Sequence, residues 1–218
     1  DLLESRGLGD VYKRQNIMGA TKKLSELICN NFQLESTSCK FVSVRFGNVL
    51  GSTGSVIPLF ERQIAAGGPI TITHPDMTRF FMTVKEATSL VLQAAAIPPD
   101  TVKNQNGNIF VLEMGEPVKI LDLAMQLVRL SGLRPNKDIE IKYTGIRPGE
   151  KLYEELFDQN ETLLKTTISD IKLVSSSIKQ AAEFDEKLQQ LEEAVDKQDK
   201  EATLNNLSEL VPTFRSRP

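Results

Sequence analysis

Four short segments carry charged or amide side chains that could do chemistry, and three of them also contain glycine. They are Met18-Gly19-Ala20-Thr21-Lys22, Arg45-Phe46-Gly47-Asn48, Met77-Thr78-Arg79-Phe80 and Arg147-Pro148-Gly149-Glu150. An arginine suits a phosphate or a carboxylate, and a glutamate can accept two hydrogen bonds from the hydroxyls of a ribose. The residue types therefore indicate a site for a phosphorylated ligand that carries hydroxyl groups.

Each segment also has a plainer explanation. Lys22 lies one helical turn after Met18, but a lysine on an exposed helix usually points to solvent. Gly47 would let a ligand approach the backbone after a strand, yet a simple strand-to-helix turn uses glycine too. A structural salt bridge would satisfy Arg79, and Glu150 fits the charged start of a helix. No segment is decisive alone.

Alternating apolar patterns predict the elements that must position these segments. We expect helices at 20–32, 56–66, 83–96, 120–131 and 151–157, and strands at 40–46, 70–73, 108–112 and 139–143. Thr83 and Glu86 have the spacing of a capping box, and Gly132 is typical of a helix end. Strands separated by helices favour an α/β fold with a mostly parallel sheet.

The C-terminal part has a different texture. Residues 158–182 are polar and weakly patterned, which indicates a linker with one strand near 171–174. Residues 183–218 are predicted to form a helical tail, a hairpin with Leu188, Leu191 and Val195 on one apolar face. The remaining face is strongly acidic, as solvated helix faces usually are. We expect the hairpin to pack on the body of the chain or on a partner chain.

The first 15 residues, DLLESRGLGDVYKRQ, show neither a helical nor a strand period and no signal-peptide core. A clean amphipathic pattern begins at Asn16. We therefore expect residues 1–15 to be a foreign or disordered leader, with an ordinary flexible arm as the alternative.

Composition excludes several classes of protein. The 218 residues include 26 Lys and Arg and 29 Asp and Glu, a net charge of −3, which argues against nucleic acid as a partner. No apolar run approaches the ~20 residues of a membrane helix. Cys29 and Cys39 cannot form a disulfide framework, so a reducing compartment is favoured. The single His74 excludes a multi-histidine metal site, and we predict no metal.

Taken in this order and spacing, the segments resemble the C-terminal part of the extended short-chain dehydrogenase/reductase enzymes that act on nucleotide sugars. More narrowly they are similar to the CapD-like polysaccharide biosynthesis branch, the UDP-N-acetylglucosamine 4,6-dehydratases. The resemblance runs from 16 to 157, and the tail also matches the long-form members. The stretches that carry it are NIMGATKK, VRFGNVLGSTGSVIPLF, MTRFFMTVKEA, GNIFVLEMGEPVKILDLA and GIRPGEKLYEEL.

The resemblance implies a partial NAD(P)-binding Rossmann-like parallel sheet with a C-terminal substrate-binding part at 16–157, followed by the helical tail. In the family, hydride leaves sugar C4 for the nicotinamide, water is lost across C5 and C6, and the hydride returns at C6. The implied cofactor is NAD or NADP, and the implied substrate is a UDP-N-acetyl hexosamine. The resemblance also implies that the full-length protein is a homo-oligomer. It further implies that this parent protein carries a membrane domain, with the present part in the cytoplasm at the inner face of the membrane.

By the same resemblance, Lys22 matches the lysine of the family's Tyr-x-x-x-Lys motif, which binds the nicotinamide ribose. Met18 stands at the tyrosine position, and because a thioether accepts no proton, Met18 is not a base. Long-form dehydratases carry a Thr-Asp-Lys triplet just upstream, but residues 8–10 here read Leu-Gly-Asp, so the triplet is absent. Phe46 and Gly47 match the loop beside the nicotinamide.

The other matches concern the substrate. The resemblance places Asn48 and Arg79 on the diphosphate, Val56 and the backbone at Ile72 beside the uracil, and Arg147 with Glu150 on the uridine, Glu150 at the ribose hydroxyls.

The sequence contains no G-x-G-x-x-G, and Gly51-Ser52-Thr53-Gly54 has the wrong spacing. We therefore expect an incomplete, inactive fragment of a 4,6-dehydratase that holds most of the substrate half. One alternative is a UDP-sugar 4-epimerase or reductase of the same superfamily. Another is a non-catalytic module for UDP-sugar binding or oligomerisation. Met18 and the stretch RPGEKLYEEL favour the dehydratase.

Overall fold

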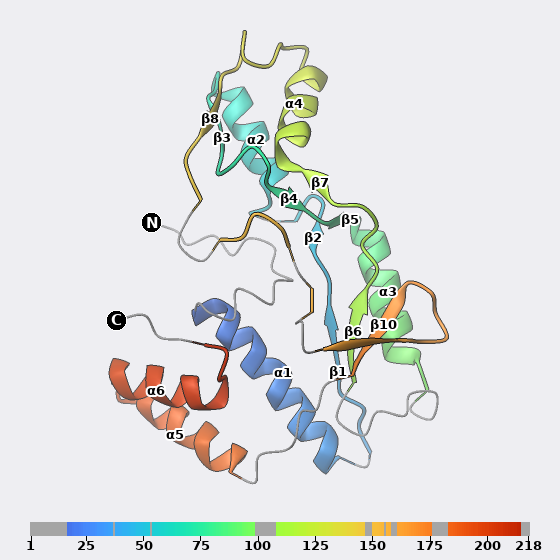
Figure 1. Cartoon of the computed structure of the whole chain (residues 1–218), viewed down its shortest axis with the longest axis vertical. Helices are drawn as coiled ribbons and strands as arrows, with labels where there is room; N and C mark the ends of the chain where they lie inside the picture. Colours follow the sequence, from blue (N-terminus) through green and yellow to red (C-terminus); the bar gives the residue numbers. More distant parts are fainter. Residues whose placement is uncertain are drawn as a thin grey trace. The chain divides into compact units, whose positions relative to one another are not determined.

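A computed structural model describes residues 17–36, 38–52, 54–98, 108–146, 150–154, 156–157, 161–175 and 183–214 (Figure 1). The predicted leader and Arg147 lie outside these residues. Helices and strands alternate along the chain, which confirms the predicted α/β class. The elements are α1 (Ile17–Glu35), β1 (Val42–Arg45), β2 (Asn48–Val49), α2 (Val56–Ala65), β3 (Ile70–Ile72), β4 (Thr78–Arg79), β5 (Phe81–Met82), α3 (Val84–Ala96), β6 (Asn108–Leu112), β7 (Val118–Lys119), α4 (Ile120–Leu130), β8 (Ile141–Tyr143), β9 (Thr162–Lys165), β10 (Ile171–Ser175), α5 (Phe184–Asp196) and α6 (Lys200–Leu210).

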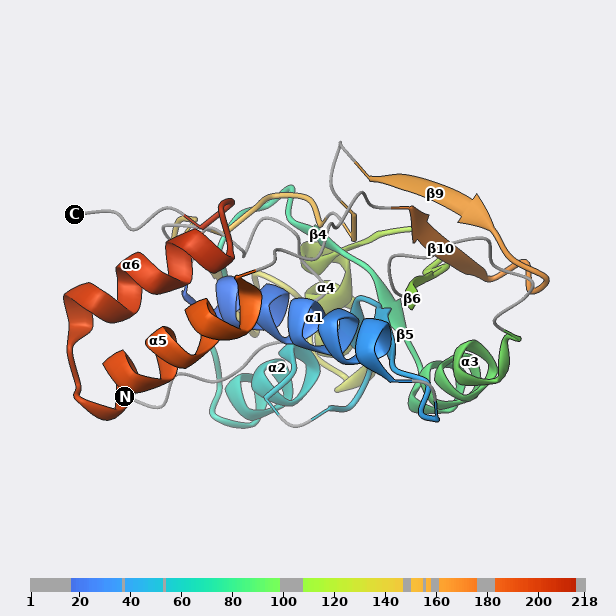
Figure 2. The ribbon, with the colours of Figure 1, turned by 90° about the horizontal axis from the view of Figure 1, so that it is seen from below.

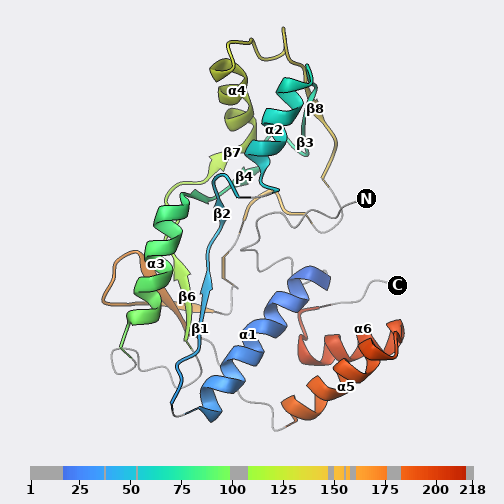
Figure 3. The same ribbon diagram turned by 180° about the vertical axis from the view of Figure 1, so that it is seen from behind.

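The chain divides into two compact units. The described part of the first unit comprises Arg45–Gln93 and Leu112–Leu156. Its core forms where α2 and α4 pack on the parallel strand pair β3–β8, as Figure 3 shows. The side chains of Phe60, Ile70 and Val128 are completely or almost completely buried there. Two further short pairs, β2–β5 (parallel) and β4–β7 (antiparallel), complete this unit.

Local sequence signals explain where the helices of this unit begin and end. In α4, Ile120, Ala124 and Val128 recur every four residues and form its buried stripe. At the start of α3, Thr83 N–H donates to Glu86 Oε2 (2.7 Å) and Glu86 N–H donates to Thr83 Oγ1 (3.2 Å), which confirms the predicted capping box. The bond from the Thr83 backbone holds the pKa of Glu86 below its ordinary value.

The described part of the second unit lies within Asp10–Val44, Ala94–Val111 and Phe157–Pro218. Its four-stranded sheet has the order β1-β6-β10-β9, and β1 and β6 each end at a residue of the first unit. Strands β9 and β10 are antiparallel, with Lys172 opposite Lys165. The parallel pairs β2–β5 and β3–β8 of the first unit agree with the predicted parallel α/β fold, and β9–β10 adds antiparallel pairing to it.

Strand β10 confirms the strand predicted near 171–174, but β9 was not predicted. Residues 162–175, assigned to a linker from the sequence, form this antiparallel pair at the edge of the sheet. An edge strand pairs on one side only, and three of the four residues of β9 are exposed. Its sequence therefore lacks the apolar alternation by which a half-buried strand is recognised.

Helices α5 and α6 form the predicted hairpin, which packs on α1 (Figure 2). Leu191 and Leu207 are buried in a cluster that also takes Leu24, Leu27 and Ile28 of α1. The expectation for Val195 is wrong: its side chain is 53% exposed, and the neighbouring Ala194 is buried instead.

Within the described residues, no helix is both long and apolar enough to cross a membrane.

Candidate functional site

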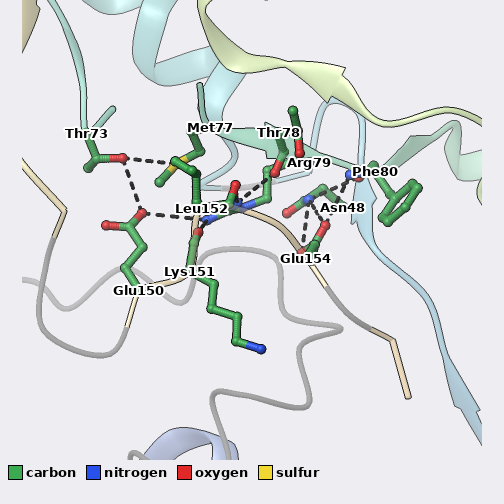
Figure 4. Close-up of polar contacts among 10 residues, drawn as sticks. All are labelled: Asn48, Thr73, Met77, Thr78, Arg79, Phe80, Glu150, Lys151, Leu152 and Glu154. Atoms are coloured by element: carbon green, nitrogen blue, oxygen red, sulfur yellow. Dashed lines mark hydrogen bonds and ion pairs between the residues drawn. The ribbon is translucent and has the colours of Figure 1, made fainter. Parts of the chain in front are cut away.

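The centre of the candidate site is the segment 150–154, which runs beside residues 78–80 in the first unit (Figure 4). Thr78 N–H donates to Leu152 O (3.1 Å), and Arg79 Nη2 donates to Lys151 O (3.0 Å). The helix predicted at 151–157 is therefore wrong for the residues described. The carbonyls of Lys151 and Leu152, which a helix would bond internally, accept from β4 instead.

Arg79 is held inside this arrangement. Its Nη1 donates to Thr78 O (2.7 Å) and Leu152 O (3.3 Å), and its Nη2 lies 3.8 Å from Glu150 Oε1. The side chains of Arg79 and Glu150 are 12% and 24% exposed. The structure thus brings two predicted site residues together. They form a salt bridge, which was the alternative to ligand binding that the sequence left open for Arg79. Both keep some exposed surface through which a ligand could reach them.

Glu150 offers an acceptor at this position. Thr73 Oγ1 donates to Glu150 Oε1 at 3.5 Å, the long end of hydrogen-bond distance. A carboxylate has two oxygens with several acceptor positions, so neither Arg79 nor Thr73 exhausts its capacity for hydroxyl donors.

Asn48 is tied to the same segment through Phe80 and Glu154. The backbone N–H of Asn48 and its side-chain Nδ2 both donate to Phe80 O, at 2.9 and 3.0 Å. Nδ2 also lies 3.2 Å from Oε2 and 3.4 Å from Oε1 of Glu154, whose Oε2 accepts from Phe80 N–H at 3.1 Å. Glu154 is 7% exposed, so this carboxylate is a buried part of the site.

Sequence reasoning missed Glu154. It lies in the quoted stretch GIRPGEKLYEEL, but in an expected helix a glutamate is usually on the solvated face. The useful signal would have been Asn48, because an amide that is even partly buried needs a hydrogen-bond partner from elsewhere in the chain.

Gly47 is required by close packing. A Cβ there would lie 2.9 Å from Phe80 Cβ and 3.1 Å from both Phe80 O and Met114 Cε. Its N–H donates to Met114 Sδ at 3.4 Å. The neighbouring Arg45 is also structural, since its buried guanidinium donates to Leu156 O at 3.3 Å. The role of Phe46 and Gly47 beside a nicotinamide stays a prediction.

Val56 and Ile72 both belong to the core of the first unit. Val56 is the first residue of α2 and packs at the edge of the core, whereas the Ile72 side chain is 2% exposed. The carbonyl of Ile72 accepts from Thr144 N–H at 2.9 Å. Their predicted place beside a uracil stays a prediction.

Met18 and Lys22 lie on α1, in the second unit. Both are exposed, and they are four residues apart on the helix, so they share a face. Among the described residues, no three His, Cys, Asp or Glu side chains gather as a metal would require.

The sequence profile of the family described as "Polysaccharide biosynthesis protein" matches residues 11–176. The chain belongs to this family. The resemblance to the polysaccharide biosynthesis family is thereby confirmed, and the 4,6-dehydratase reaction stays a prediction. The capsular polysaccharide biosynthesis protein CapD of Staphylococcus aureus is 58% identical over 146 residues, which cover 67% of this chain and 23% of that protein.

A UDP-glucose 4-epimerase of Rickettsia rickettsii is 32% identical over 208 residues, 91% of this chain and 58% of the relative. Among solved structures, Pen from Bacillus thuringiensis is 36% identical with a TM-score of 0.60, covering 74% of this chain and 48% of that one. The chain thus spans about a quarter of CapD and about half of the other two. The fold is that of the extended short-chain dehydrogenase/reductase enzymes.

Proposed function

We propose that this chain is part of a nucleotide-sugar-modifying enzyme of polysaccharide biosynthesis, specifically a UDP-N-acetylglucosamine 4,6-dehydratase. One observation carries the proposal: Asn48 and Arg79 both make polar contacts with the segment 150–154, and Arg79 forms an ion pair with Glu150 of that segment. The 58% identity to CapD supports the polysaccharide pathway. The cytoplasmic location and the homo-oligomer belong to the same proposal.

Each site residue has a role that fits its chemistry. The partly exposed carboxylate of Glu150 accepts hydrogen bonds from the ribose hydroxyls. The positive charge of Arg79 attracts the diphosphate, and Arg147 adds a second guanidinium to the uridine site. Val56 and the backbone at Ile72 line the uracil.

Lys22 is the residue that we assign to the nicotinamide ribose of NAD or NADP, with Phe46 and Gly47 beside the ring. The fit is partial: Lys22 is exposed, whereas Gly47 N–H already donates to Met114. When bound, the dinucleotide would accept and return a hydride. The ammonium of Lys22 favours the loss of a proton from the sugar hydroxyl, and Met18 takes no part in proton transfer.

A UDP-sugar 4-epimerase is the second candidate, supported by the 32% identity to the Rickettsia epimerase over 91% of the chain. The methionine at position 18 argues against it, because the family's tyrosine is missing there. Product analysis of the complete enzyme that contains this chain, with NAD or NADP added, separates the two. A 4-keto-6-deoxy sugar identifies the dehydratase, whereas a sugar that retains its 6-hydroxyl identifies the epimerase.

Calorimetric titration with UDP-N-acetylglucosamine tests the site without any dinucleotide. We expect saturable binding that weakens about tenfold or more in Arg79→Ala and in Glu150→Ala, because each loses a charged hydrogen-bonding group. Glu140→Ala, a change at an exposed carboxylate of the same unit, should bind like the wild type. The absence of binding by a chain that melts cooperatively would contradict the proposal.

A further inference from the structure

The side-chain amide of Asn48 has two N–H hydrogens and one carbonyl oxygen. Nδ2 faces Phe80 O at 3.0 Å and the two carboxylate oxygens of Glu154 at 3.2 and 3.4 Å. All three partners are acceptors, so the chemistry requires that nitrogen, and not oxygen, faces them. Both hydrogens of the amide are therefore used inside the protein, and Oδ1 is the group left to recognise a ligand.

Together with Phe80 O, Glu154 holds the amide in this orientation. Its buried carboxylate accepts from Asn48 Nδ2 and from Phe80 N–H at 3.1 Å, and Phe80 O in turn accepts from Asn48. Burying a carboxylate costs free energy unless hydrogen-bond donors surround it. A turned amide would place Asn48 Oδ1, an acceptor, against the carboxylate of Glu154, and this orientation is therefore strongly disfavoured. The described residues supply no hydrogen-bond donor to Asn48 Oδ1.

We infer that Glu154 is a positioning residue that makes Asn48 an acceptor, so that Asn48 binds a hydrogen-bond donor on the sugar and not a phosphate oxygen. The inference rests on the proposed function, which places a nucleotide sugar at this site. Phosphate oxygens are acceptors and would face another acceptor in Oδ1. With uracil and ribose assigned to other residues, the donor is a sugar hydroxyl or the N–H of an N-acetyl group. This replaces the diphosphate role that the resemblance implied for Asn48.

The first test titrates wild type and Glu154→Gln with UDP, UDP-glucose and UDP-N-acetylglucosamine. Glutamine replaces one carboxylate oxygen with an NH2 group and removes the negative charge, so Asn48 Nδ2 loses one of its acceptors and a turned amide is no longer repelled by residue 154. We expect affinity for the sugar-bearing ligands to fall about tenfold and affinity for UDP to change less than about twofold. A fall for both sugars identifies a hydroxyl donor, and a fall for UDP-N-acetylglucosamine alone identifies the N–H. Glu140→Gln, the same change at an exposed carboxylate, serves as the control.

The outcomes separate this inference from the proposed function. Unchanged affinity of Glu154→Gln for both UDP-sugars overturns the inference alone, as does an equal loss for UDP, which a general loss of structure would also cause. A wild type that binds none of the three ligands overturns the inference and the proposed function together.

A second measurement needs no ligand. The side-chain amide signals of Asn48 can be assigned in a nitrogen-15 spectrum by their absence in Asn48→Ser. We expect Glu154→Gln to shift this pair of signals and Glu140→Gln to leave it in place. Signals that stay unchanged in Glu154→Gln would overturn the positioning role.

Discussion

The polar site and the helical tail join distant parts of the chain by opposite means. In the site, hydrogen bonds connect Asn48 with Phe80, 32 residues away, and with Glu154, 106 residues away. In the tail, leucines of α5 and α6 pack on leucines of α1, with one bond from Asn31 to Asp185 beside them. Packing of the tail depends mainly on the apolar area that is buried, whereas the site depends on which donor atom faces which acceptor atom.

The largest effect is expected in the tail. Leu207→Ala removes a side chain that is 4% exposed in the cluster between α6 and α1, so it should lower the free energy of unfolding by about 3 kcal/mol. Urea denaturation measures this change. Leu130→Ala deletes the same atoms from a side chain that is 84% exposed, and we expect it to stay within about 0.5 kcal/mol of the wild type. If Leu207→Ala lowered the free energy of unfolding no more than Leu130→Ala does, packing of the tail would not stabilise the fold.

A smaller effect on stability, with a clear effect on binding, is expected at Gly47. The Cβ of Gly47→Ala would lie 2.9 Å from Phe80 Cβ, and relieving this overlap should cost about 2 kcal/mol of unfolding free energy. Because Phe80 holds both Asn48 and Glu154, the displacement should also weaken UDP-sugar binding. Denaturation and calorimetry measure the two effects.

Gly51→Ala is the matched control. Gly51 has φ +73° and open space around its Cα, so alanine there meets backbone strain of about 1 kcal/mol but no overlap. We expect it to leave UDP-sugar binding unchanged. If both alanine variants weakened binding alike, packing against Phe80 would not be the cause.

The same contrast explains how much of the fold the sequence could predict. The strand at 108–112 and the helices α2, α3 and α4 were found from apolar period and capping residues, because these signals are local. The prediction of a helix at 151–157 was wrong. Its charged residues have helical spacing, but the backbone carbonyls of this segment accept hydrogen bonds from β4. Strand β9 was not predicted, because at the exposed edge of the sheet its apolar and polar residues do not alternate.

For the site, the sequence could point to Arg79 and Glu150, whose chemistry demands partners and whose spacing matches a known family. It could not reveal that the two form a pair at 3.8 Å, nor that Glu154 orients Asn48. Those facts depend on which segments meet in space, and a single sequence carries no periodic signal for a polar contact across a hundred residues.

The smallest effect concerns a polar contact that is local. Arg134 donates to Asp138 from Nε and Nη2, both at 2.7 Å, and its backbone N–H adds a bond of 2.8 Å. These hydrogen bonds from Arg134 lower the pKa of Asp138 to about 2. The pair therefore stabilises the folded chain fully above pH ~4, and this contribution is lost as the pH falls from there to about 2.

Arg134→Met should raise the pKa of Asp138 toward its ordinary value, which a carbon-13 titration of the carboxyl group measures. Arg134→Lys keeps the charge but not the two-pronged geometry, so we expect a pKa between the two. The stability difference between Arg134→Met and wild type should be small, because both partners reach solvent, and it should vanish near pH ~2. A difference that grew on acidification would contradict the sign of this linkage. We expect that replacing the carboxylate of Asp138, unlike that of Glu154, leaves ligand binding unchanged.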